Sequence, residues 1–101
     1  IIKINIKNKK KKKKIEEIRI DIYKIDIEIL SLIEKRKKLV DRVVKLKTKE
    51  EIVDQIRIDK ILSKIDLEAK KKMLPSEMIR SIWEKMINGF IEYEKRHFEK
   101  K

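Results

Sequence analysis

The sequence predicts an all-α fold of three helices, one long and two shorter, and three observations support this prediction. Apolar residues recur at steps of three and four, which is the spacing of one face of an α-helix. The 101 residues include one Gly and one Pro, too little turn material for many short strands. Charged residues form 48% of the chain and hydrophobic residues 41%, a balance typical of a few long amphipathic helices.

The long helix is predicted over residues 15–47. Its apolar positions are Ile15, Ile18, Ile22, Ile25, Ile29 and Leu32, and the same register resumes at Leu39, Val43 and Leu46. About 33 residues give a length of ~50 Å. Because this exceeds the diameter of a small domain, and because a lone chain of this kind leaves apolar faces uncovered, we expect the helix to span a homodimer.

The two shorter helices follow a connection at residues 48–51. The second helix is predicted from Asp54 to about Lys71, with its apolar set at Ile58, Ile61, Leu62, Ile65 and Ala69. The string KKKMLPS then ends one helix and opens the next at Pro75 and Ser76. The third helix is predicted from about Ser76 to His97, and one stripe of it carries Ile79, Trp83, Met86, Phe90 and Tyr93.

Residues 1–14 form a low-complexity, lysine-rich segment, separate from a helical domain at residues 15–101. Ile2, Ile4 and Ile6 alternate with polar residues, which suggests a strand, whereas the block of six lysines at residues 9–14 predicts disorder by self-repulsion. A dispensable tail is favoured over an anion-binding arm. Removing the eight lysines of this segment from the net charge of +12 leaves +4, so the remaining body is only mildly basic.

Composition also excludes several classes of site and partner. Cys is absent and a single His cannot build a His-rich site, so we expect no metal and no cofactor. No stretch approaches the ~20 apolar residues of a membrane span. Lys or Asn interrupts every candidate secretory signal in the first fourteen residues. We therefore expect a cytoplasmic protein without a membrane partner, and the near-balanced body disfavours nucleic acid.

Charged residues that interrupt the apolar pattern are the candidate site residues. Arg36 stands where the stripe between Leu32 and Leu39 requires an apolar residue. A guanidinium on a buried seam is costly unless it meets an anion, so either a structural ion pair or a bound substrate is implied. Lys47 follows eleven residues later, about three helical turns, and would project from the same face.

Further candidates lie on the other helices and near the start of the long one. Asp54 and Arg57 are spaced i, i+3, and an exposed intrahelical pair is the simpler interpretation. Glu94 lies on a side stripe with Ile87, Ile91 and Phe98, where apolar neighbours disfavour a charged carboxylate. Arg19 precedes Arg36 by ~26 Å along the helix, so both serve one small molecule only if different subunits supply them.

These residues form an ordered set that resembles a known family. The long helix carries Arg19-x6-Asp26-x9-Arg36-x10-Lys47, the second helix carries Asp54-x2-Arg57, and the third ends with IWEKMINGFIEYE. The set is similar to the all-helical chorismate mutases, including their isochorismate pyruvate lyase relatives, over roughly residues 15–98. The resemblance implies an intertwined homodimer that rearranges chorismate, a dicarboxylate, to prephenate in aromatic amino-acid biosynthesis.

The resemblance also implies a role for each candidate. Arg19 matches the arginine that the partner subunit inserts into the site, and Arg36 matches the arginine that grips a substrate carboxylate within the same subunit. Lys47 matches the lysine that reaches a carboxylate and the ether oxygen. Asp54 and Arg57 match the acid near the ring hydroxyl and the arginine beside it. Glu94 matches the Gln or Glu that hydrogen-bonds the ether oxygen.

The chemistry so implied needs no nucleophile, metal or organic cofactor. Arginines hold the two carboxylates through paired hydrogen bonds, and fixing the folded conformer lowers the entropic part of the barrier. Cationic Lys47 and protonated Glu94 would donate to the ether oxygen as negative charge builds there. Two positions depart from the family pattern. Ile58 stands where many relatives have Glu, and Phe90 stands where some have a small hydroxyl residue.

Three other interpretations stay open. An isochorismate pyruvate lyase could use the same basic residues to bind an isomeric substrate. Ile58, which departs from the mutase pattern, leaves that alternative open. A basic helical protein that binds nucleic acid or an acidic partner is supported by the lysine segment. In a purely structural helical oligomer, Arg36 would serve only in the interface between helices. Arg36→Leu would then stabilise the oligomer without loss of function.

Overall fold

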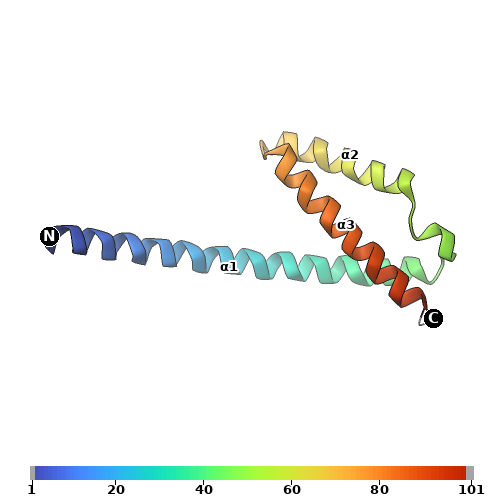
Figure 1. Cartoon of the computed structure of the whole chain (residues 1–101), viewed down its shortest axis with the longest axis horizontal. Helices are drawn as coiled ribbons and strands as arrows, with labels where there is room; N and C mark the ends of the chain where they lie inside the picture. Colours follow the sequence, from blue (N-terminus) through green and yellow to red (C-terminus); the bar gives the residue numbers. More distant parts are fainter. Residues whose placement is uncertain (1, 100–101) are drawn as a thin grey trace. The chain divides into compact units, whose positions relative to one another are not determined.

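The computed structural model describes residues 2–99, and side chains from residue 6 to residue 98. The elements in chain order are α1 (Ile2–Val44), a 3₁₀ helix η1 (Lys49–Glu51), α2 (Gln55–Lys71) and α3 (Ser76–Glu99), as Figure 1 shows. No strand occurs among the described residues. The predicted all-α fold of one long and two shorter helices is therefore confirmed. The chain divides into two compact units, Ile1–Arg36 and Lys37–Lys101.

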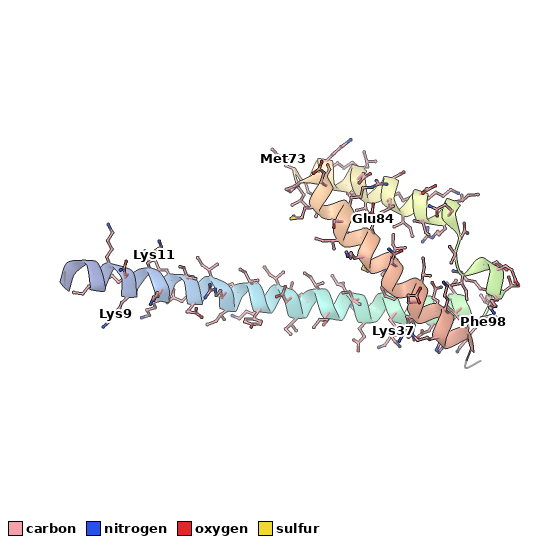
Figure 2. The ribbon with its side chains drawn as sticks, in the orientation of Figure 1. Lys9, Lys11, Lys37, Met73, Glu84 and Phe98 are labelled. Atoms are coloured by element: carbon pink, nitrogen blue, oxygen red, sulfur yellow. The ribbon has the colours of Figure 1, made fainter. Side chains whose placement is uncertain are left out.

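The first unit consists of the greater part of α1. The strand suggested by the alternating isoleucines is wrong, because the helix already begins at Ile2. The lysine block also lies within α1, where the sequence predicted disorder, and Lys9 and Lys11 project from different sides of it (Figure 2). Neither Gly nor Pro separates this segment from the amphipathic stretch that follows, and Lys is a good helix former.

The second unit is built from the end of α1, the connection, α2 and α3. Its buried apolar core takes Val44 from α1, Ile52 from the connection, Leu62 and Ala69 from α2, and Ile87 from α3. Helices α2 and α3 pack against each other. An ion pair between Arg80 of α3 and Asp66 of α2 adds a polar contact, with Nη1 and Oδ2 separated by 2.7 Å.

A tight turn reverses the chain between α2 and α3. The Leu74 N–H donates to the carbonyl of Ala69 at 2.9 Å, and the Met73 N–H donates to that of Lys70 at 3.1 Å. These paired bonds form a Schellman motif that satisfies the last carbonyls of α2. Met73 occupies its left-handed position with φ of 58°, where glycine is the usual residue, and its side chain projects from the turn (Figure 2).

The ends of the two shorter helices agree with the sequence. Asp54 caps α2, which ends at Lys71 as expected, and α3 begins at Ser76 and runs two residues past the predicted His97. The carbonyl of Pro75 accepts from the Ile79 N–H at 3.1 Å, so Pro75 opens the first turn of α3. Over the part of the chain that the structure describes, no helix is both long and apolar enough to cross a membrane.

Candidate active site

Two of the candidate residues meet in the second unit. The Lys47 ammonium donates a hydrogen bond to the Glu94 carboxylate, with Nζ and Oε1 separated by 3.2 Å. The Glu94 side chain is 9% exposed and that of Lys47 is 22% exposed. The contact joins residues 47 positions apart in the sequence. It is therefore a tertiary contact that places one cation and one acid in a largely desolvated position.

Glu94 is buried because of the stripe of α3 on which it lies. Ile87, one full heptad earlier, is 5% exposed, and Ile91 and Phe98 on the same stripe are half-buried. The expected apolar surroundings of Glu94 are therefore confirmed. The stripe predicted as the main apolar face, from Ile79 to Tyr93, is only half-buried throughout. A buried carboxylate requires a charged or hydrogen-bonding partner, and Lys47 supplies it.

Lys47 reaches Glu94 from a turn and not from a helix. The prediction that the long helix continues to residue 47 is wrong, because α1 ends at Val44. The Lys47 N–H still donates to the carbonyl of Val43 at 3.1 Å, which closes the last turn. Thr48 is then extended, and its backbone N–H and hydroxyl both donate to the Glu51 carboxylate. These local bonds compete with helix continuation, so α1 ends before Lys47. That Lys47 projects from the same face as Arg36 stays a prediction.

A second polar cluster lies beside this pair, and the sequence interpretation missed it. The Tyr93 hydroxyl donates to Asp41 Oδ1 at 2.6 Å, and the Lys37 ammonium donates to Asp41 Oδ2 at 3.1 Å. Lys37 Nζ also lies 5.3 Å from the centre of the Tyr93 ring. The His97 ring stacks on Tyr93 with centroids 5.6 Å apart. The available sequence signal was the i, i+4 pair of Lys37 and Asp41, which alone indicates only a surface ion pair.

This cluster shifts two protonation equilibria. The hydroxyl of Tyr93 lowers the pKa of Asp41 below its ordinary value of 3.8, and Lys37 acts in the same direction. The hydrogen bond to Asp41, followed by that to Tyr93, raises the pKa of Lys37 above 10.5. Both shifts favour the charged forms, so the pair stays ionised at neutral pH.

Asp54 and Arg57 have a local structural relation. Asp54 is the N-cap of α2, and its Oδ1 accepts from the backbone N–H of Arg57 at 3.1 Å. This bond satisfies one of the free N–H groups at the helix start. The i, i+3 spacing of Asp54 and Arg57 thus produces a helix cap, and not the ion pair between their side chains that the sequence suggested. Ile58, the residue after Arg57, is half-buried, and its N–H donates to the Asp54 carbonyl at 3.0 Å.

The remaining candidates are placed as follows. Phe90 is half-buried on α3, one turn before Glu94. Arg19 and Arg36 belong to the first unit. Arg19 is exposed and pairs with Glu16, with Nη1 and Oε1 2.7 Å apart, whereas Arg36 is half-buried. That either arginine joins the Lys47–Glu94 pair in one site stays a prediction.

The geometry leaves a hydrogen-bond donor that an anion could use. Lys47 retains ammonium hydrogens beyond the one it gives to Glu94, since an ammonium has three donors and no acceptor. Such donors in a desolvated position stabilise developing negative charge. Among the side chains that the structure describes, those of residues 6–98, no group of three or more His, Asp or Glu is placed to hold a metal ion.

Comparison with known protein families finds a match. A family model described as chorismate mutase type II matches residues 18–95, which include every candidate residue that the sequence singled out, about half of the first compact unit and most of the second. Comparison with curated proteins and with solved structures finds no match.

Proposed function

Since this chain belongs to the chorismate mutase type II family, we propose that it is a chorismate mutase that rearranges chorismate to prephenate in aromatic amino-acid biosynthesis. The observation that carries the proposal is the contact between Lys47 and Glu94, which pairs the two residues expected at the ether oxygen. The reaction breaks one C–O bond as a C–C bond forms, so the protein has to hold a conformer and stabilise charge.

In the proposed mechanism, Lys47 is the principal donor to the ether oxygen. Its hydrogen bond to the buried Glu94 fixes the direction of the ammonium group, and its other hydrogens are directed to substrate. Arg36 holds one substrate carboxylate, and Arg19 of a second subunit holds the other. Arginine suits this task because its planar guanidinium donates two parallel hydrogen bonds to a carboxylate.

Glu94 has two roles in this proposal. In the free protein its carboxylate accepts from Lys47 and so orients that ammonium. With substrate bound, only its protonated form donates to the ether oxygen, and an ionised carboxylate there repels the developing charge. We therefore expect Glu94→Gln, whose side-chain N–H can donate in place of the carboxyl O–H, to retain activity. An inactive Glu94→Gln variant that folds normally would show that Glu94 does not act by donating.

The proposal includes a homodimer. Along α1 the apolar side chains that the sequence assigns to a seam are exposed within their own unit, among them Ile18, Ile25 and Leu32 at 58%, 54% and 62%. Soluble proteins rarely leave so continuous an apolar stripe open to water. A second copy of the chain would cover it and bring its Arg19 to the site. The cytoplasmic location remains a prediction from the sequence.

Isochorismate pyruvate lyase is the second candidate function. The observation that favours it is Ile58, half-buried beside Arg57 at a position where many mutases have Glu. An apolar residue there removes a contact on the hydroxyl side of the ring, where the two isomeric substrates differ. Lys47 and Glu94 serve both reactions, since the same ether bond breaks in each.

The decisive assay follows loss of chorismate, with products identified, using purified protein at several pH values. We expect prephenate from the wild-type protein and a fall of roughly 10²-fold or more in kcat/KM for Arg36→Ala, because the guanidinium proposed to hold a substrate carboxylate is lost. Arg96→Ala is the matched control, since Arg96 is an exposed arginine of α3. Isochorismate turnover to pyruvate without chorismate turnover would instead establish the lyase.

A further inference from the structure

Two hydrogen bonds tie the end of α3 to the segment from Asp41 to Lys47. Tyr93 donates to Asp41 at 2.6 Å, and the next residue, Glu94, accepts from Lys47 at 3.2 Å. All four residues lie in the second compact unit. The shorter bond belongs to Tyr93, which has no place in the proposed chemistry.

The two bonds constrain α3 in a way that neither does alone. Consecutive helical residues point about 100° apart, so Tyr93 and Glu94 leave α3 in different directions. Their partners are six residues apart, one on the last turns of α1 and one in the turn after it. The packing of α3 against α2 already limits the rotation of α3 as a whole. At the C-terminal end of α3, the bond at Glu94 fixes one direction and the bond at Tyr93 fixes a second, so the two together define the local rotation of this end.

The Tyr93 bond is itself supported by neighbouring charges. Asp41 is also the acceptor of Lys37, whose ammonium lies near the face of the Tyr93 ring. His97, one turn further along α3, stacks on the same ring. A hydroxyl that donates to a carboxylate forms a stronger and more directional bond than one that donates to a neutral group. The ring and the hydroxyl of Tyr93 are thus both held.

We propose that Tyr93 is a positioning residue for Glu94, and that its bond to Asp41 sets the rotation of α3 that aims the Glu94 carboxyl at Lys47 and at the substrate. The inference rests on the proposed role of Glu94. Tyr93 touches no reacting atom in this arrangement. It acts through Glu94, because small misplacements of a catalytic group lower the rate of reaction more than the affinity for substrate.

The test is Tyr93→Phe, which removes the hydroxyl and keeps the ring. We expect kcat for chorismate to fall roughly tenfold with KM changed by less than about twofold. The carboxyl carbon of Glu94, observed by NMR in protein labelled on glutamate and identified by its loss in Glu94→Gln, should change its chemical shift. The matched control is Asp66→Ala, which removes the Arg80–Asp66 contact between α2 and α3. It should lower stability while leaving kcat and the Glu94 signal unchanged.

Variants of Asp41 give an independent test. Asp41→Asn keeps an oxygen that accepts from Tyr93 and should retain most of kcat, whereas Asp41→Ala should lose as much as Tyr93→Phe. The double variant of Tyr93→Phe and Asp41→Ala should lose no more than either alone, because both remove the same bond. Additive losses, or a loss of stability with kcat and the Glu94 signal unchanged, would overturn the proposal. If the wild-type protein turns over neither chorismate nor isochorismate, the proposed function fails. The chemical shift of the Glu94 carboxyl carbon in the Tyr93 and Asp41 variants then decides by itself whether Tyr93 positions Glu94.

Discussion

At the scale of single residues, the pair of Lys47 and Glu94 links stability to chemistry. A carboxylate that is 9% exposed is costly to bury unless a cation or hydrogen-bond donor meets it. Lys47 meets it here, so removing either side chain alone should leave a polar group without its partner. The same desolvation would strengthen the field that Lys47 exerts on an anion bound beside it.

A double-mutant cycle should measure this coupling. Lys47→Met should lower the free energy of unfolding by about 1–3 kcal/mol, because Glu94 stays buried without its donor. Adding Glu94→Leu should recover most of that loss, since a matched apolar pair replaces the ionic one. Urea denaturation followed by circular dichroism provides the free energies. Lys95→Met, at an exposed lysine of α3, is the control and should change stability little. Equal losses in the single and double variants would contradict the coupling.

Asp41 should make stability depend on pH in the acid range. Its pKa is lowered in the folded state, first by the Tyr93 hydroxyl and then by Lys37, so the unfolded state binds the proton more tightly. The resulting stabilisation is complete above the ordinary value of 3.8 and is lost as the pH falls through the lower, folded pKa. Tyr93→Phe removes the largest cause of the shift. The stability of this variant should therefore fall less steeply than that of the wild-type protein below about pH 4.

Urea denaturation at several pH values between 2 and 6 would measure this effect. The wild-type and Tyr93→Phe proteins should differ most at the upper end of the range and approach each other at the acid end. Asp41→Asn, which cannot titrate, should resemble Tyr93→Phe in slope. Parallel curves for the three proteins would contradict the role of Asp41.

At the scale of elements, the turn between α2 and α3 contains a strained position. Met73 adopts φ of 58°, a left-handed conformation that costs a side-chain-bearing residue about 1–2 kcal/mol. The Schellman bonds of Met73 and Leu74 hold it there. Met73 is 92% exposed, so its side chain contributes little packing in return.

Met73→Gly should therefore raise the free energy of unfolding by about 0.5–1 kcal/mol, because glycine adopts this conformation without strain. The gain is smaller than the strain since glycine loses more chain entropy on folding. The matched control is Lys72→Gly, at a position with φ of −91°, which should destabilise the protein. Denaturation midpoints of the three proteins at one pH give the comparison. A loss of stability in Met73→Gly would show that the turn is not strained.

At the scale of the whole molecule, the apolar stripe of α1 is exposed to water unless another chain covers it. The first unit is a single helix, and a single helix cannot bury its own apolar side chains. Ile22 and Ile25 are about half exposed within it. A homodimer would cover them, and it would also allow Arg19 and Arg36 of different chains to serve one substrate.

Sedimentation equilibrium should find a dimer, and replacing Ile22 and Ile25 by Asp should dissociate it and abolish activity. Ser31→Asp, an exposed change off the stripe, is the control and should leave the dimer intact. In purified heterodimers of Arg19→Ala and Arg36→Ala chains, one of the two sites should be complete, so about half of the wild-type activity should return. Heterodimers without activity would contradict a site shared between subunits.

Much of this fold could be predicted because helices depend on local sequence. Spacing at three and four residues predicted all three helices, and the residues around Asp54 and Pro75 predicted two helix starts, because caps and proline act on their immediate neighbours. The ordered set of charged residues also identified the family, which the match over residues 18–95 confirms. The beginning of α1 was mispredicted, since alternation over three isoleucines is a weaker signal than the run of lysines at residues 9–14, which continues without Gly or Pro into the amphipathic stretch.

Sequence alone therefore determined the helical class, the family and the types of residue at the candidate site. Only the tertiary structure decided that Lys47 leaves the helix to meet Glu94, and that Tyr93 meets Asp41. These partners lie 47 and 52 positions apart, and periodicity carries no information on how one helix end packs against another. That packing also buries the side stripe of α3. Glu94, which the sequence alone would leave on the surface, is therefore buried and needs a partner.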